Sequence, residues 1–360
     1  MNVPASRGRD GPTPDKAADG AEAAPEADLE LSEPSDDLPV ALTSGDPAGI
    51  GPEIAVAARL ALGAEVPFFY IGDPAHLPEG TALAEIAAPA EALLVAPDTL
   101  PVLVQEFAAP ARPGTLDPAN AAGTIAAIRR AVELVRDGQA SAVCTNPIHK
   151  KALKDGADFP YPGHTEFLAA LAGIDRVVMM LASDALRVVP VTIHIPLSEV
   201  TAALTPELLE ETLRITHAGL IRDFGIAAPR IAVAGLNPHA GEGGAMGHEE
   251  STLIAPVLDR LRAEGMELSG PASADTMFHA PARARYDAAV AMYHDQALIP
   301  IKTLDFDRGV NVTLGLPFVR TSPDHGTALD IAGQGVASAS SLVEALRMAH
   351  RMGRNRRQAA

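Results

Sequence analysis

Residues 231–244 read Ile-Ala-Val-Ala-Gly-Leu-Asn-Pro-His-Ala-Gly-Glu-Gly-Gly, a short apolar run followed by a turn with four glycines in residues 235–244. The apolar run predicts a β-strand, and glycine lets the following turn adopt left-handed backbone conformations. Because Asn237-Pro238 ends the strand, the turn presents His239 at the strand's C-terminal end. This arrangement is typical of α/β enzymes, although a flexible surface loop has a similar composition.

The rest of the chain repeats the pattern of a short apolar run followed by a helical segment. The expected strands are residues 40–43, 66–71, 101–107, 141–145, 177–181, 188–195, 230–236 and 288–293. The expected helices are residues 52–62, 118–136, 206–224, 248–263 and 340–352. This alternation predicts an α/β fold with a mostly parallel sheet.

Residues 1–38 have a different composition. They hold ten acidic and three basic side chains, five prolines and no aromatic residue. Such a segment cannot bury enough apolar surface to offset its ordering entropy, so we expect a disordered acidic tail. The tail could dock a partner, but a solvated extension is the simpler interpretation.

Charge and cysteine content narrow the class of protein. The formal net charge of −18 argues against nucleic acid or an anionic membrane as the main partner, whereas small anionic substrates remain compatible with it. The single cysteine, Cys144, lies in an apolar run and is expected to be a buried core residue in a reducing compartment. The longest apolar region, residues 177–196, is interrupted by charged residues and proline, and no secretory signal is visible. We therefore expect a cytoplasmic protein.

Residues 44–52 form a glycine-rich turn between the first expected strand and helix, where a dinucleotide-binding fold places its phosphate loop. The Rossmann fingerprint fails here, because Ile54 occupies the third glycine position and Pro52 removes an amide donor. The turn can shape a ligand cleft or serve a purely structural purpose.

Three histidines occur where expected strands end: His194, His239 and His294. The C-terminal ends of parallel strands meet at one edge of a sheet, so these imidazoles can form a site for a divalent metal. Asp275 could add an oxygen ligand, and Asp295 could orient His294. The alternative is that each is a hydrogen-bonded structural residue.

A second set of side chains suits an anionic substrate. His164 and Thr165 open an expected helix, whose free amides can help to bind an anion. Lys302, Asn311 and Arg320 lie within or after apolar runs, and such cations can bind phosphate or carboxylate. For any one of them alone, a surface ion pair is the simpler account.

Five separated motifs together resemble the 4-hydroxythreonine-4-phosphate dehydrogenase family of pyridoxal phosphate (vitamin B6) biosynthesis. The motifs are residues 45–52, 163–167, 235–244, 292–296, and 309–311 with 320–322. The similarity extends over about residues 40–350, which is nearly everything outside the acidic tail.

The resemblance implies an NAD(P)-dependent and divalent-metal-dependent oxidation of 4-phosphooxy-L-threonine to 2-amino-3-oxo-4-phosphooxybutanoate. That product decarboxylates to 3-amino-2-oxopropyl phosphate. The resemblance also implies a homodimer with the active site at the interface. The implied metal ligands are His194, His239 and His294, with Asp275 as a further candidate. The implied substrate contacts are His164, Thr165, Lys302, Asn311 and Arg320.

Residues 324–333 look like the nucleotide-binding loop of the wider isocitrate and isopropylmalate dehydrogenase superfamily, which has a two-lobed fold without a Rossmann turn. This likeness implies NAD or NADP contacts from His325, Gly326, Thr327 and Asp330. It also implies one catalytic unit over residues 39–352, with two α/β lobes and the active site in the cleft. A mainly imidazole site favours Zn²⁺ or Co²⁺, with Mg²⁺ as an alternative.

Two other functions are compatible with these residues. One is a dehydrogenase of the same fold that oxidises threonate or erythronate 4-phosphate, or a cyclic dihydrodiol. The other is a metal-dependent hydrolase or a phosphate-binding protein, which would use the histidines and cations but not the loop at residues 324–333.

Overall fold

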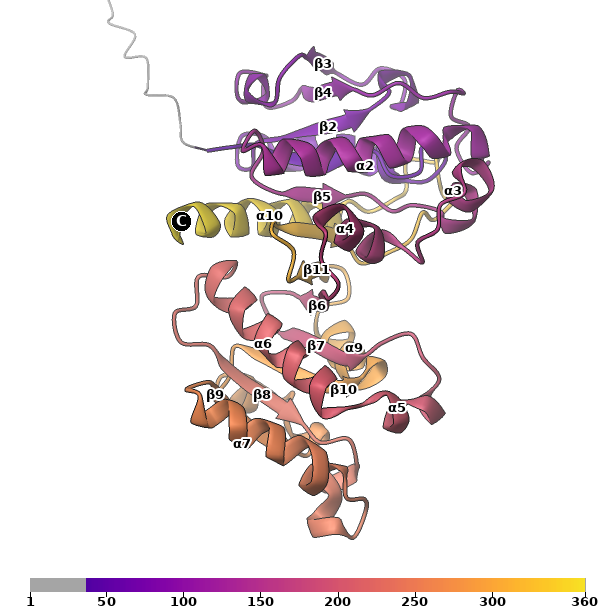
Figure 1. The fold of residues 1–360 in the computed structure, drawn as a ribbon. Coiled ribbons are helices and arrows are strands. Elements are labelled where there is room, and N and C mark those ends of the chain that lie inside the picture. Colours follow the sequence, from indigo (N-terminus) through magenta and orange to yellow (C-terminus); the bar gives the residue numbers. More distant parts are fainter. Residues whose placement is uncertain (1–36, 360) are drawn as a thin grey trace, which may run out of the picture. The chain divides into compact units, whose positions relative to one another are not determined.

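Twelve β-strands form one sheet in the computed structural model, which describes residues 37–359 (Figure 1). Most of the expected acidic tail, residues 1–36, lies outside the described residues. The strands are β1 (Val40–Thr43), β2 (Phe68–Gly72), β3 (Leu83–Ile86), β4 (Leu100–Val104), β5 (Val143–Thr145), β6 (Val178–Ala182), β7 (Arg187–Thr192), β8 (Arg230–Ala234), β9 (Glu267–Ala272), β10 (Ala288–Tyr293), β11 (Val310–Leu314) and β12 (Arg320–Pro323).

The strand order is β3-β4-β2-β1-β5-β12-β11-β6-β7-β10-β8-β9. The six strands from β3 to β12 run parallel to one another, and so do the four from β7 to β9. Between these blocks, β11 is antiparallel to β12 and β6, and β6 is antiparallel to β7. The two parallel blocks therefore point in opposite directions. The predicted α/β class with a mostly parallel sheet is confirmed.

Ten α-helices flank the sheet within the described part of the chain. They are α1 (Gly51–Leu62), α2 (Ala121–Arg136), α3 (Lys150–Ala157), α4 (His164–Ala172), α5 (Leu197–Ala203), α6 (Pro206–Arg222), α7 (Ala255–Ala263), α8 (Ala280–Arg283), α9 (His294–Leu304) and α10 (Ser340–Ala359). Helix α6 begins as predicted, because the Thr205 hydroxyl accepts the Leu208 N–H and Pro206 occupies the first turn.

Several boundaries differ from the sequence-based expectation. Strands β3, β9, β11 and β12 and helices α3, α5, α8 and α9 were not predicted as such, because they are short or lack a clear apolar period. The strand predicted for residues 188–195 ends at Thr192, and His294 begins α9 instead of ending a strand. The helix predicted for residues 248–263 consists of a π-helical turn, Glu250–Ile254, followed by α7.

The hydrophobic core is continuous on one face of the sheet and divided on the other. On the first face, residues of α1, α6, α7 and α10 pack with side chains from nearly every strand in one cluster. On the second face, α2 and α4 cover the β1 side in one cluster, and α9 covers the β7 side in another. The central strands between these two clusters present polar side chains to this second face. That gap is where a ligand site can form.

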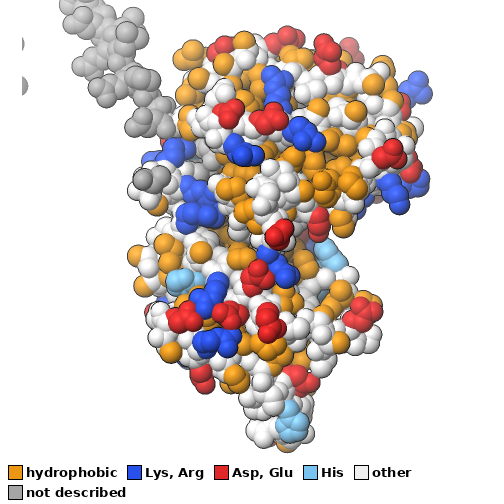
Figure 2. Space-filling view, viewed as in Figure 1, with side chains coloured by type: hydrophobic (Ala, Val, Ile, Leu, Met, Phe, Trp, Pro, Cys, Tyr) orange, Lys and Arg blue, Asp and Glu red, His pale blue; other side chains and the backbone are white. Residues whose placement is uncertain are grey.

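Three further features bear on the predictions. Cys144 is buried in β5, and burial raises the pKa of its thiol to about 12, so it is a core residue as expected. Among the described helices, none is both long enough and apolar enough to cross a membrane. On the face seen in Figure 2, Lys and Arg side chains are interspersed with Asp and Glu.

Candidate active site

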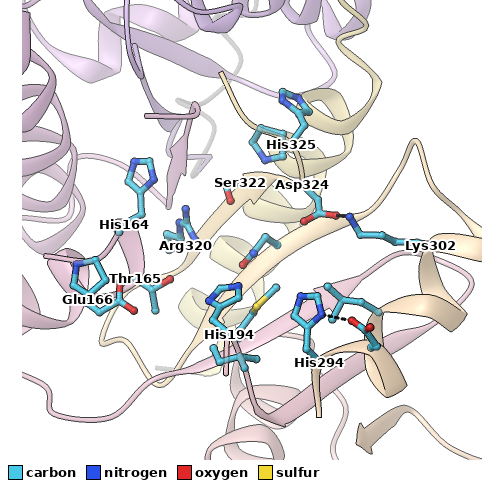
Figure 3. Close-up of a pocket in the computed structure, with 18 of the residues that line it drawn as sticks. His164, Thr165, Glu166, His194, His294, Lys302, Arg320, Ser322, Asp324 and His325 are labelled. Atoms are coloured by element: carbon cyan, nitrogen blue, oxygen red, sulfur yellow. Dashed lines mark hydrogen bonds and ion pairs between the residues drawn. The ribbon is translucent and has the colours of Figure 1, made fainter. Parts of the chain in front are cut away.

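A pocket of about 780 Å³ occupies the gap between α4 and α9, over the central strands (Figure 3). Its floor comes from β6, β11 and β12, where register pairs Asn311 with both Leu181 and Ser322. This pairing places the Asn311 and Ser322 side chains next to each other on the polar face. The predicted substrate residues His164, Thr165, Lys302, Asn311 and Arg320 all line this pocket.

Arg320, the first residue of β12, is the buried cation of the pocket. Only 3% of the residue is exposed. Its guanidinium donates to the Thr313 and Thr145 hydroxyls at 3.1 and 2.7 Å, while its buried Nε has no partner. Burial lowers the pKa of Arg320 to about 10, so the group stays charged at neutral pH. Within residues 37–359 no carboxylate forms an ion pair with it, so an anionic ligand would supply the missing counter-charge.

The N-terminus of α4 forms the wall beside Arg320. His164 and Thr165 are the first residues of this helix, and the buried Nε2 of His164 has no hydrogen-bond partner. Burial, together with the nearby charges of Arg320 and Lys150, holds the pKa of His164 well below its usual value. His164 is therefore neutral at physiological pH. A neutral imidazole and free helix amides next to two cations suit an anionic group.

The opposite wall holds an ion pair. Lys302, in the last turn of α9, has its ammonium nitrogen 2.7 Å from Asp324 Oδ2. The carboxylate is mostly buried, with 17% of its side chain exposed, whereas Lys302 is 37% exposed. This pairing leaves Lys302 partly neutralised, so Arg320 and Lys150 are the cations most available to an anion.

Two of the three predicted metal-binding histidines lie together. The ring centroids of His194 and His294 are 5.7 Å apart, and both rings line the pocket (Figure 3). His294 Nδ1 lies 2.7 Å from Asp295 Oδ1, a contact that leaves Nε2 free to bind a metal. His194 has a left-handed backbone, with φ of 55°, which is uncommon for a non-glycine residue and typical of functional sites.

The third histidine, His239, does not join the pair within one chain. It is exposed on the segment Pro238–Gly244 after β8 and does not line the pocket. Asp275 is also exposed, in the turn Ala274–Thr276. Across residues 37–359, no group of three or more His, Cys, Asp or Glu side chains is arranged to hold a metal. The His194–His294 pair offers two imidazole ligands and needs at least one more from elsewhere.

The predicted nucleotide-binding residues are more dispersed. His325 lines the pocket, and its ring nitrogen Nδ1 contacts Gly326 O at 3.0 Å. Gly326 and Asp330 are exposed. Thr327 is buried, and its carbonyl accepts the Ile50 N–H at 3.0 Å, so it packs against the turn at residues 44–52.

That glycine-rich turn has a packing function in the described chain. A Cβ atom on Gly45 would lie 2.5 Å from Pro147 O, and one on Gly49 would lie 2.8 Å from Thr327 O. The glycines therefore allow three backbone segments to approach closely. The turn does not line the pocket. The sequence left open whether this turn shapes a ligand cleft or has a purely structural purpose. The structure supports the structural purpose, which is close packing of the backbone.

Sequence reasoning did not single out several residues that line the pocket. Lys150, Glu166, Ser322 and Asp324 all contribute polar side chains. Lys150 follows β5 at the start of α3, so its place at the end of an apolar run is a signal that could have identified it.

The fold and this pocket define an α/β protein with a preformed site for a small anionic molecule. A sequence model of the pyridoxal phosphate biosynthetic protein PdxA matches residues 64–349. The chain belongs to this family, which confirms the resemblance drawn from the five motifs.

Relatives and solved structures agree with this placement. The 4-hydroxythreonine-4-phosphate dehydrogenase of Ruegeria sp. (strain TM1040) is 64% identical over 317 residues, covering 88% of this chain and 97% of that protein. The crystal structure of the enzyme of that name from Klebsiella pneumoniae is 39% identical, with a TM-score of 0.82 over 88% of this chain and 98% of that chain. A terephthalate 1,2-cis-dihydrodiol dehydrogenase from Burkholderia xenovorans is 30% identical, with a TM-score of 0.63 over 87% of this chain and 98% of that chain.

Proposed function

We propose that the protein catalyses the NAD(P)-dependent oxidation of 4-phosphooxy-L-threonine to 2-amino-3-oxo-4-phosphooxybutanoate, which decarboxylates to 3-amino-2-oxopropyl phosphate. The observation that carries this proposal is the buried Arg320, which faces a pocket and forms no ion pair with a carboxylate of the described residues 37–359. The substrate carries both a phosphate and a carboxylate, so it supplies the anion that such a site lacks. The dehydrogenase names of the close relatives specify the reaction.

The pocket residues hold and orient the substrate. Arg320 and Lys150 bind one anionic group beside the α4 N-terminus, and Asn311 offers an amide on the same floor. His164, neutral because of its depressed pKa, can accept or donate a hydrogen bond without adding charge. A volume of about 780 Å³ leaves room for the substrate and a nicotinamide ring together.

The donor set at the edge of the pocket fits a divalent metal. His194 and His294 present neighbouring imidazoles, and Asp295 holds His294 with its Nε2 available. When bound, a divalent ion supplies Lewis acidity that lowers the pKa of a substrate hydroxyl. Imidazole ligands favour Zn²⁺ or Co²⁺ over Mg²⁺.

We further propose a homodimer in which His239 of a second copy completes the metal site, with Asp275 as an additional candidate ligand. Two observations support this arrangement. His239 is exposed and does not line the pocket that holds the other two histidines. In addition, a smaller, largely apolar cavity of about 320 Å³ lies beside His194 and His294, next to Leu197, which is 71% exposed. Such a surface suits a subunit interface.

The cofactor is NAD or NADP, and its contacts are proposed to come from His325, Gly326, Thr327 and Asp330. His325 supports this proposal most directly because it lines the pocket, and its buried Nε2 has no partner. The surrounding loop at residues 324–333 joins the pocket to the turn at residues 44–52 through Thr327.

The test is NADH or NADPH formation by the purified protein with 4-phosphooxy-L-threonine, before and after treatment with a chelator. We expect turnover that is lost on chelation and restored by Zn²⁺ or Co²⁺. His239→Ala should abolish metal-dependent turnover while leaving the circular dichroism spectrum unchanged. Wild-type turnover in that variant would exclude His239 as a ligand.

A second candidate function is the oxidation of a cyclic dihydrodiol, favoured by the 30% identity to the terephthalate dihydrodiol dehydrogenase. The same assay with a cis-dihydrodiol, threonate 4-phosphate and erythronate 4-phosphate separates these activities. A higher kcat/KM for any of these than for 4-phosphooxy-L-threonine would replace the proposed substrate. Absence of NADH or NADPH with every substrate would point to a hydrolase or a phosphate-binding protein.

A further inference from the structure

We propose that Glu250 is a positioning residue for the metal site: its buried carboxylate binds Asn237 and thereby holds the segment that carries His239. This segment, residues 235–248, is called the His239 arm below. The inference rests on the proposed function, because it assigns the purpose of the arm to placing His239 against a second copy of the chain.

The backbone of the arm is one that the chain does not adopt readily without support. Five successive residues, 239–243, have left-handed conformations with φ between 43° and 79°. Three of them, His239, Ala240 and Glu242, are not glycine. A left-handed run of this kind is unfavourable for residues with a Cβ atom, so surrounding contacts must hold it in place.

Glu250 supplies such contacts at the base of the arm. It is 5% exposed, and its Oε1 accepts the Asn237 backbone N–H at 2.7 Å. Its Oε2 accepts the side-chain amide of Asn237 at 3.1 Å, and the same amide donates to Glu249 Oε2 at 2.7 Å. Asn237 lies two residues before His239, so these bonds fix the point at which the arm leaves β8.

The arm also wraps closely around these side chains. A Cβ atom on Gly241 would lie 2.5 Å from Glu250 Oε2, and one on Gly247 would lie 2.3 Å from Asn237 Nδ2. Both positions have positive φ. The glycines on either side of the exposed part of the arm therefore let the backbone close on the Asn237–Glu250 pair.

The donors to the buried Glu250 carboxylate are neutral. Within residues 37–359 it forms no ion pair with a Lys or Arg side chain, and its hydrogen-bond donors all belong to Asn237. Burial of a carboxylate with only neutral donors costs free energy of folding. The two bonds to Asn237 are therefore the contacts through which this side chain can hold the arm.

The base of the arm is in turn tied to the strand that leads to His294. Gln296 donates its side-chain amide to Gly235 O at 2.8 Å and accepts the Met292 N–H at 2.7 Å. The ends of β8 and β10 are thus bridged by one side chain. Glu250 and Gln296 together fix the position of the first residues of the His239 arm relative to the sheet.

The test is a Co²⁺ titration of the metal-free, full-length protein, followed through the visible absorption of bound Co²⁺. Glu250→Gln keeps the shape of the side chain but turns one acceptor into a donor that faces the Asn237 amide. We expect this variant to bind Co²⁺ about 10- to 100-fold more weakly, the usual effect of removing a residue that orients a metal ligand. Glu79→Gln, the same change at an exposed glutamate outside the site, should bind like the wild type.

A double variant distinguishes positioning from general destabilisation. If Glu250 acts through His239, the His239→Ala, Glu250→Gln double variant binds Co²⁺ no more weakly than His239→Ala alone. Additive losses, or wild-type affinity in Glu250→Gln, would overturn the inference. If His239→Ala itself leaves Co²⁺ affinity unchanged, the three-histidine metal site fails and the inference falls with it. Should Glu250→Gln not fold, Asn237→Ala, which removes the side-chain donor, takes its place in the same cycle.

Discussion

Arg320 has a buried charge that is unfavourable for folding but useful for binding an anion in the pocket. Its charge is buried, its Nε lacks a partner, and its two hydrogen bonds go to neutral threonine hydroxyls. A bound anion would offset the desolvation of such a charge. Stability and function should therefore respond in opposite directions when the charge is removed.

The variant Arg320→Met tests this opposition. Methionine fills similar space without a charge, so we expect an unchanged or higher Tm, in keeping with the replacement of other buried charges by apolar residues. We expect kcat/KM for 4-phosphooxy-L-threonine to fall by about 100-fold or more, because a preorganised charged donor is lost. Thermal unfolding and steady-state kinetics measure the two effects. A clear fall in Tm would mean that Arg320 serves mainly to bind Thr313 and Thr145.

His164 should make stability depend on pH. Its pKa in the folded protein lies well below the usual 6.5, so the unfolded chain binds a proton more readily. Stability from this group is complete above about pH 6.5 and is lost as the pH falls below that value. The slope is at most about 1.4 kcal/mol per pH unit.

His164→Gln removes this titration and keeps a neutral polar side chain. We therefore expect a smaller decrease in Tm between pH 7 and pH 5 for this variant than for the wild type. His217 and His350, whose pKa values are also lowered by burial, remain in both proteins, so the difference between the two curves isolates His164. Parallel Tm curves would exclude a depressed pKa for His164.

At the scale of elements, the local sequence predicts well where a strand ends and a turn begins. It predicts the backbone conformation of the segment that follows poorly. The apolar run of β8 and the glycines after it predicted a strand that presents His239, and the chain folds that way. The left-handed run at residues 239–243 and the π-helical turn at Glu250–Ile254 could not be predicted, because neither has a signature in the local sequence pattern.

Strands β11 and β12 illustrate a second limit. They are short and carry polar residues such as Asn311 and Arg320 on one face, so neither matches the apolar run expected of a buried strand. Strand β11 is antiparallel to both of its neighbours, whereas β12 is antiparallel to β11 and parallel to β5, and these pairings follow from the whole sheet. The sequence nevertheless predicted these residues as substrate contacts through the family motifs, and all of the predicted contacts line one pocket.

Helix α3 provides a prediction at this scale. It begins with Lys150 at the pocket and packs at its other end against Pro118, where a Cβ atom on Gly156 would lie 1.9 Å from the carbonyl oxygen. Gly156→Ala should therefore displace α3 and lower stability by about 1–3 kcal/mol. Denaturant unfolding measures this loss. Lys154→Ala, at an exposed position of the same helix, is the control, and equal stability of the two variants would contradict the account.

At the scale of the whole molecule, the reversal of strand direction creates the site. Two parallel blocks of opposite direction meet through β11 and β6, and the face above them is left uncovered between α4 and α9. One chain places the five predicted substrate contacts and two imidazoles in that gap. The third imidazole, His239, is left on an exposed arm, so the proposed three-histidine metal site would need a second chain to complete it.

Subunit complementation tests this central claim most directly. His239→Ala and His294→Ala are purified separately, each inactive, then mixed in equal amounts under conditions that exchange subunits. A mixed dimer contains one intact site, formed by His194 and His294 of the first variant and His239 of the second. Because half of randomly paired dimers are mixed, we predict that NADH or NADPH formation with 4-phosphooxy-L-threonine returns to about one quarter of the wild-type rate. No recovery of activity despite demonstrated subunit exchange would contradict the account, because it would mean that each metal site takes all its histidines from one chain.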